Sequence, residues 1–478
     1  MMKKTTIKNL LLLAFTLSFL VSCNNNSGRA PVGNDEINDF VWQGMNNFYL
    51  WQKEVPDLND RFTTFQQIWD FYADFNSPRD VFNSLLYQPG TVDRFSWIVD
   101  DYVALENSFQ GINVSNGMEF GLVRFATNTS NVFGYVRYII PASDAETKGV
   151  TRGMIFTEID GTQITDSNFN SLLFGDNTSY TISLADYNDG DPVSNGNTIT
   201  LNKTQLQENP VHLATTITEG ANKIGYLMYN QFASSFDNQL NAAFASFQGE
   251  GITDLIVDLR YNGGGSAATA RYLATMITGQ FDGQIFSKSV YNDKLQPNLS
   301  EGFLNKRFSN TFDEGGAINS LNLNRVFFIT TGSSASASEL VMNSLSPYID
   351  VKSVGVTTLG KVRGSITIYD SDDFLRDGAN LNQDHTWALQ PLVVEIQNSN
   401  DSNQPNGITP TVSLREDYGN LGVLGDRSDP LLDRTIILIT TGNRAQQPTS
   451  TQNFDEISNS QINKPFRNNM LVDYKGSK

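Results

Sequence analysis

The sequence is poor in cysteine and in histidine. Cys23 is the one cysteine among 478 residues, and His212 and His385 are the two histidines. A single cysteine excludes disulfide bonds within the chain and cysteine-based zinc sites. The two histidines lie in different local contexts, and neither is in a small-residue turn of the kind that forms a catalytic site. Few catalytic sites with a histidine as the base are therefore possible. A Ser-His-Asp arrangement stays possible, because His385 directly follows Asp384.

Positively charged residues are also scarce. Lys and Arg number 33 against 51 Asp and Glu, which gives a net charge of −18 at pH 7. Nucleic-acid binding relies on clustered Lys and Arg that neutralise phosphates, so we expect no nucleic acid among the partners. Hydrophobic residues make up 39% of the chain, which suffices for folded cores. At roughly 100–200 residues per domain, the length predicts two to four domains.

Long hydrophobic runs are absent except near the N-terminus. Three lysines within the first eight residues precede an apolar stretch at residues 10–21, which is too short to span a bilayer comfortably. The segment Leu20-Val21-Ser22-Cys23 resembles a bacterial lipobox, in which the cysteine is lipidated and becomes the first mature residue. The alternative is an ordinary signal peptide in which Cys23 occurs by chance.

The lipobox implies a lipoprotein signal peptide at residues 1–22 and a flexible tether at residues 23–35. We therefore expect a protein of the cell envelope that is held at the membrane by lipidated Cys23. The Asn-rich start of the mature chain has no acidic cluster after this cysteine. That composition favours the periplasmic face of the outer membrane in a diderm bacterium.

The rest of the chain divides into four regions by pattern. Residues 36–109 carry apolar residues at helical spacing and predict an N-terminal helical domain. Residues 110–205 contain short strand candidates separated by turns. Residues 206–445 alternate strands with helices, which is typical of an α/β layer fold. Residues 446–478 are polar and poorly periodic, so we expect a loosely packed or disordered tail.

A small-residue loop offers a candidate nucleophile. The apolar run at residues 325–330 is followed by a Ser/Ala/Gly-rich loop that contains Ser336, and then by an apparent helix. A loop between a strand and a helix can expose a hydroxyl beside free backbone N–H groups, as a serine nucleophile requires. Neighbouring serines compete for this role. Ser336 with Glu339 also fits a helix capping box, in which the serine has only a structural role.

Lys361 is a candidate base, 25 positions after Ser336. A free lysine has a pKa of about 10.4 and is protonated at neutral pH. Burial among apolar groups lowers that pKa, and a fall of about three units corresponds to roughly 4 kcal/mol. A catalytic Lys361 should therefore be buried and without a carboxylate partner. The alternative is a solvated surface lysine.

A glycine-rich turn follows the apolar strand predicted at residues 254–259. It contains Gly263, Gly264 and Gly265 in succession, and glycine lets backbone N–H groups approach a substrate closely. A phosphate-binding loop is excluded, since no Gly-Lys-Ser/Thr follows. The alternative is a tight turn that only connects a strand to a helix.

Several of these motifs together resemble the C-terminal processing (tail-specific) peptidase family. The resemblance rests on four motifs in a fixed order: Ile224-Gly225-Tyr226, Asp258 to Gly265, Ser334 to Glu339, and Leu359-Gly360-Lys361. It implies a serine/lysine endopeptidase with Ser336 as nucleophile and Lys361 as general base. The N–H groups of Gly264 (or Gly263) and Ala337 would form the oxyanion hole, with no metal and no cofactor.

The sequence departs from the family pattern around the lysine. Leu359 replaces a Phe, Val362 replaces a Gly, and Ser365 stands where a glutamine would orient the lysine. Ser365 could still form a hydrogen bond, although with a shorter reach. How Lys361 is held is therefore open, and a catalytically weak or inactive peptide-binding lipoprotein is the alternative function.

The stretch Val136 to Gly161 resembles a PDZ domain of the type found in bacterial proteases. Such domains receive the C-terminal carboxylate of a peptide, which adds as a strand to a sheet edge. The corresponding loop predicts substrate contacts at Phe120, Gly121 and Leu122. The resemblance as a whole implies a multidomain α+β protein with a helical N-terminal domain, a PDZ-like β-rich module and an α/β (crotonase/ClpP-like) core. Its substrates would be unfolded or extended proteins, bound through their C-termini.

Overall fold

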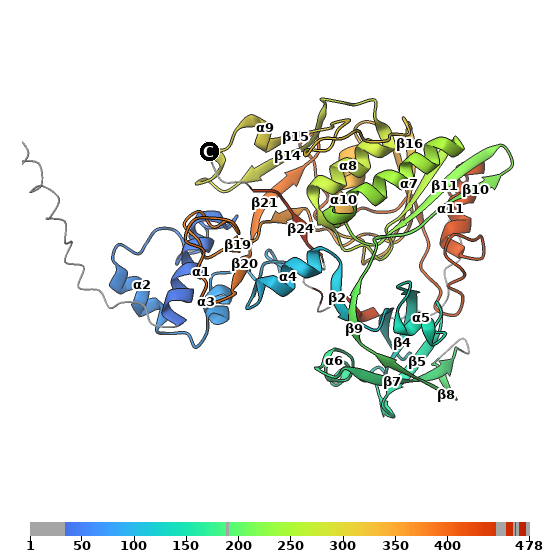
Figure 1. The fold of residues 1–478 in the computed structure, drawn as a ribbon, viewed down its shortest axis with the longest axis horizontal. Helices are drawn as coiled ribbons and strands as arrows, with labels where there is room; N and C mark the ends of the chain where they lie inside the picture. Colours follow the sequence, from blue (N-terminus) through green and yellow to red (C-terminus); the bar gives the residue numbers. More distant parts are fainter. Residues whose placement is uncertain (1–33, 188–190, 446–455, 462–463, 465–467, 475–478) are drawn as a thin grey trace, which may run out of the picture.

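The computed structural model describes residues 34–187, 191–445, 456–461, 464 and 468–474. The predicted signal peptide, Cys23 and nearly all of the predicted tether lie outside these residues. Within the described part of the chain, no helix is long and apolar enough to cross a membrane. Figure 1 shows a helical region and a β-rich lobe, both attached to a larger α/β body.

The N-terminal region is helical, as predicted. Its elements are α1 (Asn34–Phe48), α2 (Phe65–Tyr72), α3 (Pro78–Ser84), β1 (Trp97–Val99) and α4 (Tyr102–Phe109). Thr64 and Ser77 cap α2 and α3 by accepting from backbone N–H groups of the first turn. Phe40, Val41 and Met45 of α1 are buried in the same hydrophobic core as the α/β body. The helical region is thus packed onto the body.

Residues 110–205 form a β-rich lobe with its own core, which includes Phe120, Val136, Phe156 and Ile182. The sheet order is β23-β3-β4-β5-β7-β8, with β6 on β5, and β23 (Glu456–Asn459) comes from the C-terminal part of the chain. The bounds are β3 (Met118–Arg124), β4 (Val132–Ile139), β5 (Ile155–Ile159), β6 (Thr162–Gln163), β7 (Ser179–Asp186), β8 (Val193–Asn202), α5 (Asp144–Thr147) and α6 (Phe169–Phe174). The antiparallel pair β2 (Ile112–Ser115) and β9 (Thr204–Gln207) joins the lobe to the body.

The body contains a six-stranded sheet of order β10-β11-β12-β16-β17-β22, parallel except for β10. The bounds are β10 (Val211–Glu219), β11 (Asn222–Tyr229), β12 (Asp254–Asp258), β16 (Arg325–Thr330), β17 (Asp350–Gly355) and β22 (Val412–Ser413). Successive side chains point to opposite faces of a strand. Val257 and Phe328 accordingly pack with α7 (Asp237–Glu250), α8 (Ala267–Thr278) and α10 (Ala337–Leu345), whereas Ile256 and Phe327 pack with α11 (Pro430–Thr441).

A second six-stranded sheet of the body has the order β13-β24-β18-β21-β14-β15. Its strands are β13 (Gly265–Ser266), β14 (Ile285–Tyr291), β15 (Asn305–Arg307), β18 (Arg363–Ser365), β21 (Leu392–Gln397) and β24 (Met470–Leu471). The N-terminal strand β1 pairs with β20 (Ala388–Gln390), which also pairs with β19 (Ile368–Tyr369). The helical region is therefore joined to the body by sheet pairing as well as by packing.

The expectation of a loosely packed tail is wrong for the described part of residues 446–478. Here β23 (Glu456–Asn459) adds to β3 of the lobe, and β24 lies between β13 and β18. Ser458, Asn469 and Met470 are buried. β23 is mostly polar and β24 has only two residues, so no apolar period marks either strand in the sequence. They are held in place by backbone hydrogen bonds to strands that lie far away in the sequence.

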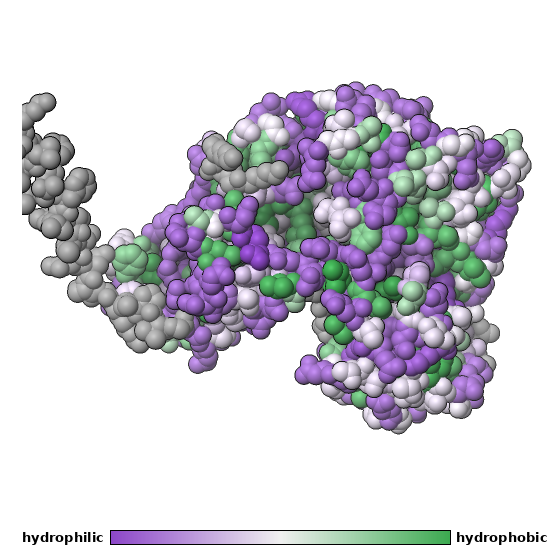
Figure 2. Space-filling model, in the orientation of Figure 1, coloured by the Kyte–Doolittle hydropathy of each residue, from purple (hydrophilic) through white to green (hydrophobic). Residues whose placement is uncertain are grey.

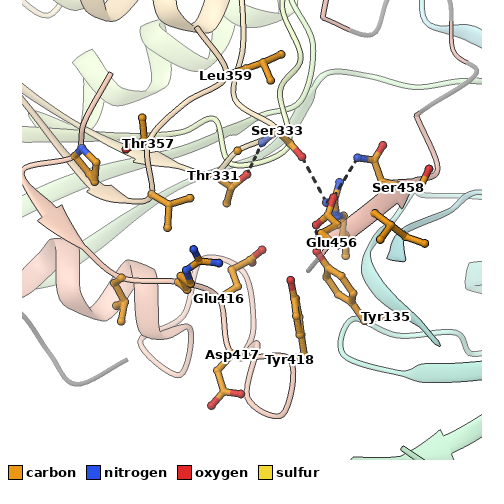
Figure 3. A pocket seen from close by; sticks show the side chains of 18 of the residues that line it. Tyr135, Thr331, Ser333, Thr357, Leu359, Glu416, Asp417, Tyr418, Glu456 and Ser458 are labelled. Carbon is orange, nitrogen blue, oxygen red and sulfur yellow. Dashed lines mark hydrogen bonds and ion pairs between the residues drawn. The ribbon is translucent and has the colours of Figure 1, made fainter. Parts of the chain in front are cut away.

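The surface view shows how the lobe and the body meet. In Figure 2 most of the visible surface is hydrophilic, and green hydrophobic residues gather near the junction between the lobe and the body. The junction also contains a cavity of about 870 Å³. It is lined by the loop before α10, by residues 414–418 and by β23, as Figure 3 shows.

Candidate active site

Ser336 lies at the N-terminus of α10, where the loop after β16 turns into the helix. Its φ of 64° and ψ of −114° fall in a region that non-glycine residues rarely adopt, at a cost of about 1–3 kcal/mol. The residue is fully buried, and its Oγ has no hydrogen-bond partner among the described residues. Of the predicted capping box, the half in which Glu339 accepts from the Ser336 N–H is formed, whereas the Ser336 hydroxyl makes no capping hydrogen bond and remains available for chemistry.

The neighbouring serines are engaged in structural contacts. Ser334 Oγ donates to the carbonyl of Leu259 at 2.8 Å, and Ser338 Oγ donates to the carbonyl of Asn262 at 3.0 Å. Both residues hold the loop against the glycine-rich turn after β12. Ser333 is half-buried at the cavity, with its Oγ 3.5 Å from Arg137 Nη2. The structure thus separates Ser336 from its competitors.

Glu339 joins the serine loop to the lysine loop. Its Oε2 accepts from the backbone N–H groups of Ser336 and Lys361, both at 2.8 Å. Its Oε1 accepts from the N–H of Gly360 at 2.7 Å and from the Thr358 hydroxyl. One buried carboxylate therefore fixes the backbone on both sides of the site. From the sequence alone Glu339 is predicted only as part of a cap, because Thr358, Gly360 and Lys361 lie 19 to 22 positions away.

Lys361 has the environment expected of a general base. The side chain is 1% exposed, and burial lowers its pKa to about 7, although the carboxylates of Asp93 and Glu339 oppose part of the fall. Its Nζ donates to Asn469 Oδ1 at 3.3 Å and lies 5.1 Å from the ring centre of Phe95. No carboxylate within the described residues forms an ion pair with it. A substantial fraction of Lys361 is thus neutral near pH 7.

The N-terminal helical region supplies one wall around the lysine. Arg94 Nη2 donates to the carbonyl of Gly360 at 3.3 Å, and Phe95 faces the ammonium. Asp93 is fixed by the Tyr49 hydroxyl at 2.6 Å and by the Ser96 N–H at 2.9 Å. Sequence reasoning missed this wall, since nothing near residues 93–95 indicates that they pack against a loop more than 260 positions away.

The family's glutamine position does not contact the lysine here. Ser365 Oγ is buried and has no hydrogen-bond partner among the described residues. The amide that reaches Lys361 belongs instead to Asn469, whose Nδ2 donates to Gln390 Oε1 at 3.3 Å. Asn469 comes from the segment for which the sequence suggested no role.

The glycine-rich turn lies directly against the serine. A Cβ on Gly264 would lie 2.7 Å from Ser336 Cβ and 2.8 Å from its Oγ, so only glycine fits. The φ of Gly264 is 115°. Its N–H donates to Asn262 Oδ1 at 2.9 Å in this conformation, so it is not free for an oxyanion. Ala337 opens α10, where first-turn N–H groups have no partner within the helix.

Neither histidine belongs to this site. His385 Nε2 lies 2.9 Å from Asp370 Oδ2, and its Nδ1 accepts from the N–H of Trp387 at 3.1 Å, so both ring nitrogens are occupied. His212 packs edge-on against Tyr138 in the lobe interface, and burial lowers its pKa to about 4. Among the described residues, no cluster of three or more His, Cys, Asp and Glu could hold a metal ion.

The predicted substrate contacts lie on β3 of the lobe. The side chains of Phe120 and Leu122 are buried in the lobe core, so any contribution they make to an edge comes from their backbone. That edge is occupied by β23, with Ser458 opposite Leu122 and Asn459 opposite Gly121. A second cavity of about 390 Å³ lies between β3 and α6, and Phe120 lines it.

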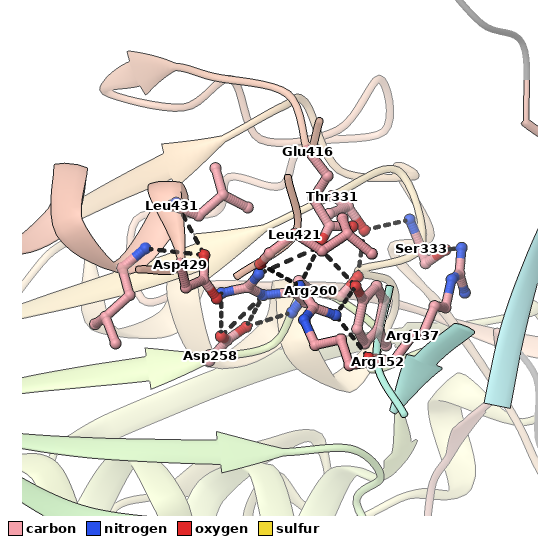
Figure 4. A network of polar contacts seen from close by, with 12 residues as sticks. Arg137, Arg152, Asp258, Arg260, Thr331, Ser333, Glu416, Leu421, Asp429 and Leu431 are labelled. Atoms are coloured by element: carbon pink, nitrogen blue, oxygen red, sulfur yellow. Dashed lines mark hydrogen bonds and ion pairs between the residues drawn. The ribbon is translucent and has the colours of Figure 1, made fainter. Parts of the chain in front are cut away.

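A buried charge network connects the lobe to the body below the glycine-rich turn (Figure 4). The guanidinium of Arg260 pairs with Asp258 and Asp429, each at 2.7 Å, and with Glu416 at 3.2 Å. Arg152 of the lobe also pairs with Glu416 at 3.0 Å. Burial alone would raise the pKa of Glu416, but the two arginines bring it down to about 2. The network fixes the end of β12, where the turn begins.

Comparison with protein families identifies the chain. The model of peptidase family S41 matches residues 223–414, and the model of the S41 N-terminal domain matches residues 36–97. Together the two models cover more than half of the sequence. The chain belongs to peptidase family S41. It is a serine peptidase of the C-terminal processing type, and the prediction from the four motifs is confirmed at this level.

A solved structure of an S41 protease has the same fold. An S41 protease from Bacteroides fragilis is 23% identical with a TM-score of 0.66, and the match covers 87% of this chain and 99% of that one. The photosystem II D1 C-terminal processing protease is 18% identical with a TM-score of 0.49, over 84% of this chain and 100% of that one. No curated protein matches the sequence significantly. The fold class expected for the N-terminal region and the α/β core is thereby confirmed.

Proposed function

We propose that this S41 peptidase cleaves peptide bonds with Ser336 as nucleophile and Lys361 as general base. One observation carries the proposal: the same carboxylate, Glu339, holds the backbone of both residues at 2.8 Å. The hydroxyl of Ser336 is buried without a hydrogen-bond partner in the described chain, and burial lowers the pKa of Lys361 to about 7. A base with this pKa is suited to neutral pH.

In the proposed reaction, neutral Lys361 takes the proton of Ser336 while Oγ attacks the carbonyl carbon of the scissile peptide bond. The oxyanion accepts from the N–H of Ala337 and from an N–H of the glycine-rich turn. The charged lysine then gives its proton to the departing amine, which leaves an acyl-enzyme on Ser336. Water, activated by the same lysine, hydrolyses the ester and restores the serine.

The described conformation needs a rearrangement before this reaction. Ser336 Oγ and Lys361 Nζ do not form a hydrogen bond, since the lysine donates to Asn469 instead. The Gly264 N–H must also leave Asn262 if it is to face the oxyanion. Catalytic hydrogen bonds often tighten only when substrate is bound. We therefore interpret this conformation as a resting state of the enzyme.

The assignment is tested by comparing Ser336→Ala, Lys361→Ala and the double variant on an unstructured protein. Residues that act as a unit have non-additive effects, so each single variant should lose about as much activity as the double variant, at least 10³-fold. His385→Ala is the control and should retain activity, because its ring is held by Asp370. Undiminished cleavage by either single variant would contradict the assignment.

We also propose that the lobe at residues 110–205 is a PDZ-like module that binds the extended C-termini of protein substrates. Support comes from β3, whose edge accepts an added strand, as peptide ligands of PDZ domains do. The test is cleavage of reporter proteins that differ only in their last residues. A rate that does not depend on the C-terminal sequence would contradict this part of the proposal.

The proposed location is the periplasmic face of the outer membrane, with an anchor at Cys23. It rests on the lipobox Leu20-Val21-Ser22-Cys23 and on the lack of an acidic cluster after it. Metabolic labelling with a fatty acid should mark the wild-type protein and leave Cys23→Ser unlabelled. Equal labelling of the two proteins would refute the anchor.

A further inference from the structure

The C-terminal segment, of which the structure describes residues 456–461, 464 and 468–474, begins at the sheet edge where a substrate is expected to bind. Its strand β23 pairs antiparallel with β3, so that Asn459 lies opposite Gly121. The Ser460 N–H then donates to the carbonyl of Phe120 at 2.9 Å. This is the strand addition by which sheet edges recognise extended peptides. The peptide-binding edge of the lobe is thus already occupied by the protein's own chain.

A buried carboxylate fixes the same segment beside this edge. Glu119 of β3 is 1% exposed and lines the cavity between β3 and α6. It accepts from Lys464 Nζ at 2.5 Å and from Ser460 Oγ at 2.6 Å. A buried carboxylate left without such partners would be costly. Any peptide that replaces the segment must therefore satisfy Glu119, which a lysine or arginine side chain does best.

The other end of the segment reaches the serine. The carbonyl oxygen of Asn469 accepts from the N–H of Gly265 at 2.7 Å. That oxygen lies 2.5 Å from the position of a Cβ on Gly264, and Ser336 Oγ lies 2.8 Å from the same position. The peptide carbonyl and the hydroxyl are thus neighbours. At the same residue, the side-chain oxygen of Asn469 accepts from Lys361.

The segment runs through this site as an extended strand. Met470–Leu471 pairs in parallel with Gly265–Ser266 on one side and with Ser365 on the other. The Val472 N–H adds a bond to the carbonyl of Ser365 at 3.0 Å. The slot between β13 and β18 therefore has the shape and the backbone hydrogen-bonding groups for one extended peptide.

We propose that the C-terminal segment is an intramolecular pseudosubstrate: its described residues occupy two places on the route of a protein substrate, one at Glu119 and one beside Ser336, and they keep the enzyme latent. A substrate with a basic residue for Glu119 displaces it and takes its place in the slot between β13 and β18. This inference rests on the proposed function, because it takes Ser336 as the reacting residue. Beyond that function, it assigns the route along which the substrate binds and a preference for substrates with a basic side chain opposite Glu119.

A tethered segment competes strongly with peptides in solution. A segment carried by the same chain has an effective concentration on the order of 1 mM at its own site. A free peptide with a dissociation constant of about 0.1 mM would then bind the intact chain roughly tenfold more weakly than a chain whose segment is released. The inference thus predicts a measurable difference in affinity.

The experiment measures binding of a fluorescein-labelled synthetic peptide with the sequence of residues 456–474. All protein chains carry Ser336→Ala, so binding is read without cleavage and does not depend on the catalytic assignment. Lys464→Glu in the full chain places two carboxylates together at Glu119 and should release the segment. Its matched control is Lys53→Glu, whose side chain is 74% exposed.

Fluorescence anisotropy should show about tenfold tighter binding by the Lys464→Glu chain than by the parent or the Lys53→Glu control. A peptide that itself carries Lys464→Glu should bind the released site at least tenfold more weakly. A chain that ends at Ala445, with its folding checked by a cooperative thermal transition, should match the Lys464→Glu chain. Equal affinity for all chains, or no binding by the released ones, would overturn the inference.

Discussion

The desolvation of Lys361 leads to a prediction that separates a catalytic lysine from a structural one. Phe95 covers the ammonium at 5.1 Å, and burial lowers the pKa of the lysine to about 7. Replacing Phe95 by Asn should admit water, which restores part of the charged form's solvation and raises this pKa. Phe95→Leu keeps the apolar cover and serves as the matched control.

The magnitude follows from the neutral fraction of Lys361. With a pKa of about 7, half of the lysine is neutral at pH 7; with a pKa raised to about 9, only about 1% is neutral. The value of kcat/KM for Phe95→Asn should therefore fall about 50-fold at pH 7 and recover by about pH 10. The Leu variant should follow the wild-type profile.

The assay is a pH profile of kcat/KM on an unstructured protein, with the thermal transition of each variant as a check on folding. The rising limb should move to higher pH only for Phe95→Asn. A loss of activity that is the same at every pH would show that Phe95 acts through structure alone. An unmoved limb would refute the idea that desolvation by Phe95 sets the basicity of Lys361.

Three further predictions concern stability and fit. Lys361→Met should raise the free energy of unfolding by up to about 4 kcal/mol at pH 7, and this gain should shrink toward pH 10. The reason is that Lys361 binds its proton more tightly in the unfolded chain than in the folded one between these pH values. Urea titrations at pH 7 and pH 10 test this, and an equal gain at both would contradict it. Arg260→Met leaves buried carboxylates unpaired and should lower the free energy of unfolding by about 3–5 kcal/mol, whereas Lys53→Met, at an exposed ion pair, should leave the urea midpoint unchanged. A small loss for Arg260→Met would contradict the assigned role of the network. Gly264→Ala should abolish cleavage, because its Cβ would collide with Ser336. Gly332→Ala is the control and should remain active, because a Cβ there meets no atom within 4 Å. An active Gly264→Ala enzyme would disprove the close fit.

The nucleophile loop could be predicted from sequence because its signals are local. An apolar strand, a run of small residues and a helix follow one another within residues 325–345, and β16 and α10 form there. The turn at Gly264 and Gly265 could also be predicted from sequence, because consecutive glycines indicate a turn. The structure explains why they are needed: their φ values of 115° and 132° are conformations that favour glycine. Local patterns therefore placed Ser336 and the turn correctly in strand-to-helix connections.

The environment of the lysine could not be predicted, because it is assembled from distant segments. Phe95 comes from the helical region and Asn469 from the C-terminal segment, each more than 100 positions from Lys361. The sequence instead indicates Ser365 as the residue that holds the lysine. Its hydroxyl contacts no partner in the described chain. Which polar group reaches a buried amine depends on tertiary packing that periodicity does not encode.

The C-terminal strands show a second limit of pattern reading. A strand such as Met470–Leu471 is too short to display alternation, and Glu456–Asn459 is mostly polar. Each forms because an existing sheet offers unpaired backbone groups on its edge. Such segments are recognised only when their partner strands are known.

The wall of residues 93–95 beside the lysine has a consequence for how these peptidases diversify. Since Arg94 and Phe95 belong to the N-terminal helical region, part of the chemistry of the base is encoded outside the segment that carries the serine and the lysine. A chimaera that received its first domain from another relative would keep both reacting residues, yet would work over a different range of acidity. Exchange of whole domains is thus a route by which such an enzyme adapts to a new compartment with its reacting groups unchanged.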